Sequence, residues 1–186
     1  MKKLDQFIMN YNNEFLNLLQ IDKITQLKIK KLFFLIINIK KNKKKIIVAG
    51  NGGSAAIASH FSVDMTKNGG VRCINFNESD LLTCFSNDYG YENWLKQALK
   101  FYLDSGDLVI LISASGSSKN IINAAKFTKM KKNKLVTLTG FNGKNLVNKL
   151  GNLNFAVNSK NYNLIENVHQ YLLLLVIDLI NHMQKQ

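Results

Sequence analysis

The chain has 186 residues, 46% of them hydrophobic, and carries a formal net charge of +13. A chain of this size and composition can build one hydrophobic core, so we expect a single domain over residues 1–186 with no internal linker. The positive charge comes almost entirely from lysine, because Arg72 is the one arginine of the sequence. Since arginine is the residue that reads bases and holds phosphates with two hydrogen bonds, the charge does not predict a nucleic-acid partner.

The pattern also argues against a membrane or secreted protein. No apolar run approaches the roughly 18 residues that cross a bilayer. The first residues, MKKLDQFIMNYNNEF, have polar side chains where a signal peptide needs a continuous apolar block. We therefore expect a cytoplasmic protein with no membrane partner. Cys73 and Cys84 show no metal-ligand spacing, and we interpret both as core thiols in a reducing compartment.

In chain order, the hydrophobic pattern begins with two helices. Apolar residues recur at spacings of three and four from Leu4 to Leu19 and from Ile24 to Ile39, which predicts two amphipathic helices. The second is apolar over most of its surface, so we expect the sheet and another subunit to cover it. A lysine-rich block follows at 40–45, and two interpretations stay open for it: a solvated connector and a patch that attracts anions.

The rest of the chain alternates strands and helices. We expect, in order, strand 46–49, helix 54–67, strand 71–76, helix 79–86, a turn at 87–90, helix 91–102, strand 107–113, helix 118–130, strand 134–139, helix 144–149, strand 153–157 and helix 163–183. Strands separated by helices predict a parallel sheet with crossover connections and helices on both faces. The expected fold class is therefore a doubly wound α/β domain.

Two turns, at 50–54 and at 113–118, each follow an apolar strand and open a helix. Ligands of doubly wound sheets bind at the carboxyl ends of strands, so both turns are candidate ligand loops. Glycines let the backbone approach a ligand, and a helix start offers free N–H groups and a positive dipole end to an anion. Taken alone, either turn can be an ordinary N-cap and polar loop. Together they predict a cage for one phosphate monoester.

The first turn also fits a dinucleotide-binding pattern. Residues 50–55 match G-x-G-x-x-A, and Glu78 follows near the end of the next strand. This pattern is weakly specific, and a dinucleotide fold has no use for the serines of the second turn. We therefore expect no nucleotide cofactor.

Four motifs, GNGGSA, SNDYGYE, ISASGSS and TLTGFNG, resemble in this order the sugar isomerase (SIS) domain family, and within it the phosphoheptose isomerases. The resemblance covers about residues 10–182. It implies a five-stranded parallel α/β sandwich over 42–186, with a helical pair at 1–41 used in packing a homotetramer whose active sites lie between subunits. It also implies a phosphorylated sugar as ligand. The matching phosphate-binding and substrate-binding positions are Asn51, Gly52, Gly53, Ser54, Asp88, Ser113, Ser115 and Ser118.

The helix after the first turn carries His60 and Asp64 at an i,i+4 spacing, which places both side chains on one face. This spacing suits a metal pair, or a base and the group that orients it. A plain hydrogen bond between the two residues is the alternative. In phosphoheptose isomerases the corresponding positions hold His and Glu, both zinc ligands, and the Glu also moves protons, so the resemblance implies these roles for His60 and Asp64.

The last helix carries Glu166 and His169 on one face. In the family a Gln stands at the position of Glu166, and a His that binds zinc and carries a proton stands where this chain has Leu174. Leucine can do neither, so Glu166 and His169 are the nearest replacements. The expected metal site is a zinc held by His60, Asp64 and Glu166 with one open position.

Two functions stay open. The first is aldose–ketose isomerisation of a sugar phosphate resembling sedoheptulose 7-phosphate, for surface polysaccharide heptose synthesis. In it Asp64 and Glu166 carry the proton, His169 assists, and Asp88 binds sugar hydroxyls. The stretch between Asp64 and Asn77 is shorter than in typical phosphoheptose isomerases, so a different sugar is also open. The second function, motivated by the missing family histidine, is a non-catalytic SIS module that binds a phosphosugar or scaffolds a protein.

Overall fold

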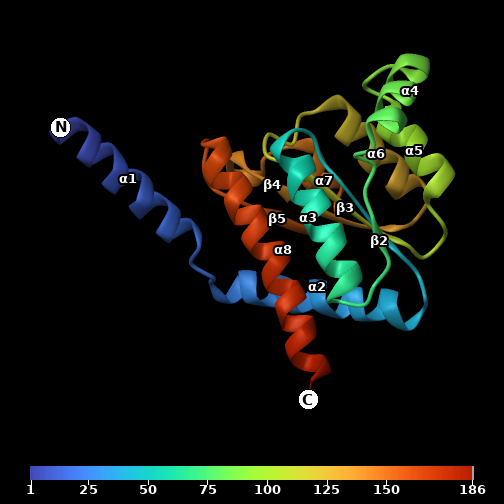
Figure 1. Cartoon of the computed structure of the whole chain (residues 1–186), viewed down its shortest axis with the longest axis horizontal. Helices are drawn as coiled ribbons and strands as arrows, with labels where there is room; N and C mark the ends of the chain where they lie inside the picture. The colour runs from blue at the N-terminus through green and yellow to red at the C-terminus, as the bar shows by residue number, and fades with distance from the viewer. Residues whose placement is uncertain (186) are drawn as a thin grey trace.

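The computed structural model of the chain describes residues 1–185, and Figure 1 shows its elements. Its helices are α1 (Lys2–Leu18), α2 (Lys23–Lys41), α3 (Gly53–Lys67), α4 (Ser79–Tyr89), α5 (Trp94–Tyr102), α6 (Lys119–Met130), α7 (Leu146–Leu150) and α8 (Tyr162–Gln184), with a short 3-10 helix, η1, at Phe141–Gly143. Its strands are β1 (Ile46–Ala49), β2 (Cys73–Ile74), β3 (Leu108–Ser113), β4 (Lys134–Thr139) and β5 (Leu153–Ala156).

The five strands form one parallel sheet in the order β2-β1-β3-β4-β5. This order confirms the doubly wound α/β fold, because the chain moves from β1 outward to β2 and then returns past β1 to β3. The reversal lies between β1 and β3, where Ala49 pairs with Leu111. Loops that leave these two strands therefore emerge side by side at the carboxyl end of the sheet.

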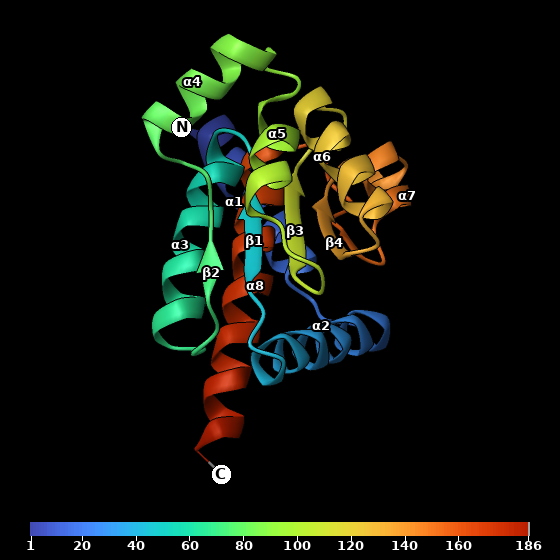
Figure 2. The same cartoon turned by 90° about the vertical axis from the view of Figure 1, so that its right-hand side faces the viewer.

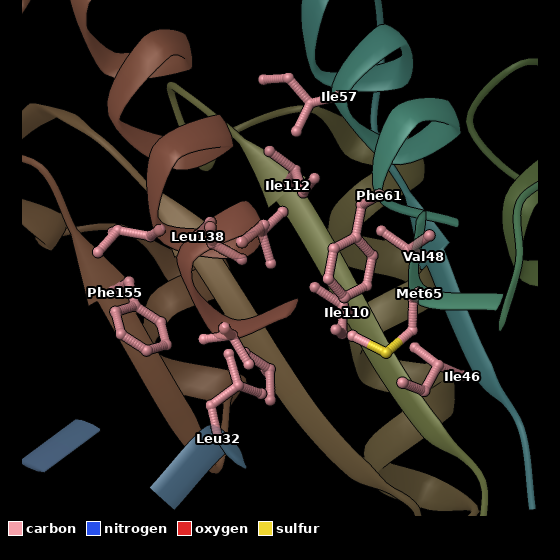
Figure 3. Packing of buried hydrophobic residues seen from close by; sticks show 14 of the residues in the cluster. Leu32, Ile46, Val48, Ile57, Phe61, Met65, Ile110, Ile112, Leu138 and Phe155 are labelled. Atoms are coloured by element: carbon pink, nitrogen blue, oxygen red, sulfur yellow. The ribbon is translucent and has the colours of Figure 1, made fainter. Parts of the chain in front are cut away.

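Helices cover both faces of the sheet (Figure 2). On one face α2, α3 and α8 pack against apolar side chains of β1, β3, β4 and β5. Figure 3 shows part of this core, with Phe61 and Met65 of α3 lying over Val48 and Ile110 of the strands. On the other face α5, α6 and α7 close a second cluster that includes Trp94 and Ile121, with α4 at its edge. The strands are thus buried on both sides, as their continuous apolar runs require.

Most predicted boundaries differ from the structure by one to three residues, and two larger differences have an explanation in particular residues. The predicted strand 71–76 shrinks to two residues, because the Thr66 hydroxyl bonds both the N–H and the C=O of Cys73, at 3.1 and 3.2 Å. Past the strand, Asn75 turns the backbone by accepting the N–H of Asn77 at 3.0 Å. The predicted turn at 87–90 is instead the last turn of α4, which ends at Gly90 with a φ of +78°. Only a residue that tolerates positive φ ends a helix this way without strain.

Helix α1 projects from the body of the molecule, with the N-terminus at its far end (Figure 1). It has no buried residue, and Leu4, Phe7 and Ile8 are each more than 60% exposed. Near its end Glu14 ties it to the domain by accepting a hydrogen bond from the Ser159 hydroxyl at 2.8 Å. An amphipathic helix with an exposed apolar face lacks the partner surface that such a face requires.

Helix α8 is the one described helix that is long and apolar enough to span a membrane by length and composition. Half of its most apolar window is buried inside the domain. It packs against α2 and α3 through Val168, Leu172 and Val176. The core therefore accounts for the buried half of its apolar surface. The prediction of two core thiols is right for the buried Cys73 and wrong for Cys84, which is exposed on α4.

Candidate functional site

The loops after β1 and β3 meet at the carboxyl end of the sheet, where each opens a helix. The first loop turns through Gly52, whose φ of +54° favours glycine, and α3 begins at Gly53. Gly50 has no room for a side chain, because an added Cβ would lie 2.6 Å from the Cβ of Ser54 and 2.8 Å from its backbone. The second loop ends at Ser118, the N-cap of α6. Both helix starts therefore lie against the same space.

A hollow of about 140 Å³ lies between these loops and the start of α8, and we call it the serine hollow. Its charged lining residue is Glu166, and no lysine or arginine lines it. The complete lining is Asn51, Ser54, Ile112, Ser113, Ala114, Ser115, Ser118, Tyr162 and Glu166. The structure thus brings together five predicted ligand-binding residues and the predicted carboxylate.

The serines of the hollow retain hydroxyl hydrogens for a ligand. The Ser113 oxygen accepts the N–H of Gly116 at 3.2 Å. The Ser115 oxygen accepts both the hydroxyl of Ser117, at 2.9 Å, and its N–H, at 3.3 Å. In each case the serine acts as acceptor, so its own O–H can still donate. Several O–H donors beside the positive end of α3 make the hollow suited to an anion.

Glu166 closes the hollow from α8, and Gly53 leaves the space for it. A Cβ added at Gly53 would overlap the carboxylate of Glu166. The absence of a side chain at this first residue of α3 thus lets the carboxylate lie against the helix start. The residue that the sequence predicted as a proton carrier therefore lies directly beside the predicted anion site.

His60 and Asp64 form the expected pair further along α3. The Nε2 atom of His60 lies 3.2 Å from an Asp64 oxygen, and its Nδ1 atom lies 3.1 Å from the Nε2 atom of Gln170 on α8. Both ring nitrogens are therefore engaged. An imidazole that donates from Nε2 to the carboxylate and accepts the Gln170 amide at Nδ1 satisfies both contacts. Gln170 lies one helical turn beyond Glu166 on α8, so the pair lies past Glu166 and outside the lining of the hollow.

The expected zinc ligands do not gather into one set. Among residues 1–185 no group of three His, Cys, Asp or Glu side chains is placed to hold a metal ion. His60 and Asp64 lie together, while Glu166 faces Gly53, about two helical turns earlier along α3. The position of the family histidine, Leu174, packs against the core. These residues do not fit a zinc ion as a set, and the reaction derived below contains no metal step.

Two further predicted residues lie away from the hollow. His169 is fully buried, and its Nε2 atom lies 3.1 Å from the carbonyl oxygen of Thr139. Burial lowers the pKa of His169 to about 4, so the ring is neutral near pH 7. Asp88 is exposed on α4, where its carboxylate receives the amide of Asn87 at 3.0 Å. Neither residue lines the serine hollow, and we leave both out of the proposed reaction.

The sequence reading missed four residues around the hollow: Tyr91, Asn120, Tyr162 and Gln170. Gln170 could have been found from its position one turn after Glu166, on the same helix face. Asn120 follows the serine turn by two residues and was read as an ordinary helix position. Tyr91 lies in the SNDYGYE motif, which assigned it no role, and Tyr162 carries no local sequence signal, because only the fold brings it to the loops.

Comparison with known proteins places these features in a wider group. The model of the SIS domain matches residues 10–140. The chain is 32% identical over 147 residues to the phosphoheptose isomerase of Aliarcobacter butzleri, covering 76% of this chain and 77% of that protein. It is 34% identical over 125 residues to the phosphoheptose isomerase of Buchnera aphidicola, covering 64% of this chain and 65% of that protein, which is just under two thirds of its length.

Solved structures agree with the sequence relatives. The phosphoheptose isomerase of Neisseria gonorrhoeae superposes with a TM-score of 0.87 at 28% identity, covering 95% of this chain and 99% of that one. A phosphoheptose isomerase from Francisella tularensis also gives a TM-score of 0.87, at 22% identity, and shows a shared fold.

Proposed function

Because this chain belongs to the SIS domain family, we propose that it is a phosphosugar isomerase that interconverts an aldose and a ketose phosphate. The observation that carries the proposal is the serine hollow, in which O–H donors face an anion site and Glu166 lies at its edge. The relatives named phosphoheptose isomerase support a substrate resembling sedoheptulose 7-phosphate.

In this reaction the phosphate of the sugar binds in the serine hollow. Hydroxyls of Ser54, Ser113 and Ser115 donate to its oxygens, and the start of α3 favours its negative charge. The hollow is small, so the sugar carbons extend from it toward α8. This position brings the carbonyl end of the sugar to Glu166 and then to the His60–Asp64 pair.

Glu166 then moves the carbon-bound proton. Starting from the ketose, its carboxylate removes a proton from C1, and the C–H electrons form the C1–C2 double bond of an enediolate. The same carboxyl group returns the proton to C2, while the hydroxyl proton on O1 passes to O2. O1 and O2 are on neighbouring carbons, so this proton passes between them without a protein group. Both ring nitrogens of His60 are held, by Asp64 and Gln170. Asp64 orients the imidazole.

The assembly and location of the protein are part of the same proposal. We infer a cytoplasmic protein that supplies heptose for surface polysaccharide. We also infer the homotetramer that the resemblance implies. The exposed apolar residues of α1, among them Leu4 and Phe7, support packing against other copies. Light scattering coupled to gel filtration tests this assembly, and a monomer at micromolar concentration would contradict it.

The isomerase proposal is tested by solvent exchange. Ketose phosphates with five to seven carbons are incubated with the protein in deuterated water, and deuterium at C1 or C2 is measured by NMR. We expect incorporation with at least one sugar and a loss of about a hundredfold or more in Glu166→Gln, the typical contribution of a general base. Asp178→Asn is the matched control, because it removes an exposed carboxylate from the same helix.

A second function, a non-catalytic phosphosugar-binding module, is favoured by the leucine at position 174. The same experiment separates the two. Binding of a sugar phosphate with no deuterium exchange across the panel would establish the module and refute the isomerase. Addition of a chelator to the active protein is expected to leave the exchange rate unchanged, and a loss that zinc restores would show that the reaction uses a metal after all.

A further inference from the structure

Asn51 and Asn120 form a reciprocal amide pair across the two ligand loops. The Asn51 amide nitrogen donates to the Asn120 side-chain oxygen at 3.0 Å, and the Asn120 nitrogen donates back to the Asn51 oxygen at 2.8 Å. Asn120 lies in the first turn of α6 and is 1% exposed. These two part-buried hydrogen bonds fix both the separation of the loops and the orientation of the two amides.

The pair also determines what Asn51 can offer to a ligand. Its oxygen receives a second hydrogen bond, from the Tyr91 hydroxyl at 3.3 Å, which fills both of its lone pairs. Its nitrogen uses one hydrogen for Asn120, and among residues 1–185 no acceptor is recorded for the other. Asn51 lines the serine hollow, so it can act there only as a donor. A donor suits a phosphate oxygen and does not suit a cation.

We propose that Asn120 is a positioning residue that holds Asn51 as a hydrogen-bond donor to the phosphate of the substrate. The inference rests on the proposed function, because it takes the serine hollow as the phosphate site. Asn120 acts from the side of Asn51 opposite the free N–H. Without it the Asn51 amide is free to rotate, and its oxygen can then face the phosphate, where it repels the anion.

The test uses inorganic phosphate as the probe and measures its affinity by titration calorimetry. We expect Asn120→Leu, which keeps the volume and removes both hydrogen bonds, to weaken phosphate binding about tenfold. Asn123→Leu is the matched control, because Asn123 lies one turn further along α6 and donates to the Glu92 carbonyl at 2.9 Å. That variant is expected to bind phosphate within about twofold of the unaltered protein.

A double variant separates positioning from general damage. In the Asn51→Ala background, Asn120→Leu should cost nothing further, since the group that it positions is gone. A further tenfold loss in that background, or an Asn120→Leu affinity within twofold of the unaltered protein, would overturn the inference. Where a sugar phosphate is turned over, the same variant should raise KM and leave kcat within about twofold.

A replacement variant and the phosphate binding of the unaltered protein separate failure of this inference from failure to fold and from failure of the proposed reaction. Asn120→Ser takes the place of Asn120→Leu if circular dichroism shows that the leucine variant does not fold, and the same tenfold weakening is expected of it. Absence of phosphate binding by the unaltered protein would overturn both this inference and the proposed phosphate site. Phosphate binding without isomerase activity would refute the proposed reaction alone and leave the role of Asn120 to be decided by the variants.

Discussion

The two ends of the sheet carry polar side chains of similar kinds and use them in opposite ways. At the amino end Asp107, which is 1% exposed, accepts the N–H groups of Lys45 and Asp104 at 3.0 and 2.9 Å and pairs with the Lys45 ammonium at 2.6 Å. Asn133 donates to the carbonyls of Asp104 and Asp107 at 2.8 and 3.0 Å. At the carboxyl end, Ser113 and Ser115 act as acceptors and keep their hydroxyl hydrogens for a ligand.

This difference shows how the fold divides stability from function. The amino-end groups are paired with one another, so this end contributes to folding. Burial opposes the charge of Lys45, yet its hydrogen bonds to Asp104 and Asp107 raise its pKa. At the carboxyl end, the hydroxyl hydrogens of Ser113 and Ser115 are left to donate to a ligand such as a phosphate. Substitutions at the two ends should therefore affect different measurements.

The largest expected effect is at the amino end. Asp107→Ala should lower the free energy of unfolding by about 3–5 kcal/mol, because it leaves two buried N–H groups without an acceptor and removes the buried one of the two carboxylates that pair with Lys45. Urea denaturation measures this loss. Asp104→Ala is the control, since its side chain is 76% exposed, and it should lower the unfolding free energy far less than Asp107→Ala does. Equal losses of unfolding free energy in the two variants would contradict the separation of stability from function between the two ends. A lower isomerisation rate in folded Asp107→Ala would contradict it as well.

The next effect is a pH dependence that arises from His169, between the two ends. Its pKa is about 4 in the folded chain because burial disfavours the charged ring, and about 6.5 in the unfolded chain. Between these values the unfolded state binds the proton and the folded state does not, so stability falls as the pH falls from 6.5 to 4. The loss should approach about 3 kcal/mol at pH 4.

His169→Gln should remove this slope, because glutamine does not titrate. Denaturation is measured at intervals from pH 7.5 to pH 4 for both proteins. Asn167→Gln, at an exposed and non-titrating position of the same helix, is the control and should keep the slope of the unaltered chain. An unchanged slope in His169→Gln would assign the pH dependence to other groups.

Much of the fold could be read from the sequence, because buried strands and amphipathic helices leave strong local patterns. The prediction was weakest where a single side chain redirects the backbone, as Thr66 does at Cys73. The lysine-rich block shows the same limit. Lys41 is exposed, as a solvated connector requires, while Lys45 at its end is paired with two aspartates that lie about 60 residues away along the chain.

The candidate site divides in the same way. The serines were predicted from two glycine-rich or serine-rich turns, and Glu166 from the family resemblance, and the structure brings these residues together. The three expected zinc ligands do not come together, because His60 lies about two helical turns further along α3 than the residue that Glu166 faces. The spacing of residues within one helix does not predict how two helices are aligned. His169 was misplaced for a related reason. His169 shares a helix face with Glu166 over one turn, but its ring points into the core. There its Nε2 atom lies 3.1 Å from the carbonyl oxygen of Thr139.

The smallest expected effect is at the carboxyl end and should appear in binding alone. Ser115→Ala removes a hydroxyl donor from the serine hollow, and a hydrogen bond to a charged group contributes about 1.5 kcal/mol or more. We therefore expect KM for the sugar phosphate to rise about tenfold. Because the phosphate is bound equally in the ground state and the transition state, kcat should change by less than about twofold. The unfolding free energy should fall by no more than about 1 kcal/mol, since the two hydrogen bonds that the variant loses join Ser115 to the exposed Ser117.

Ser105→Ala is the matched control for this variant. Ser105 is exposed in the loop before β3, at the amino end of the sheet, and its loss should change neither KM nor stability. If Ser115→Ala instead lowered the unfolding free energy by about 2 kcal/mol with KM unchanged, the serine turn would be an N-terminal cap of α6 and not a ligand site. The two ends of the sheet would then both serve stability, and the phosphate would have to bind elsewhere.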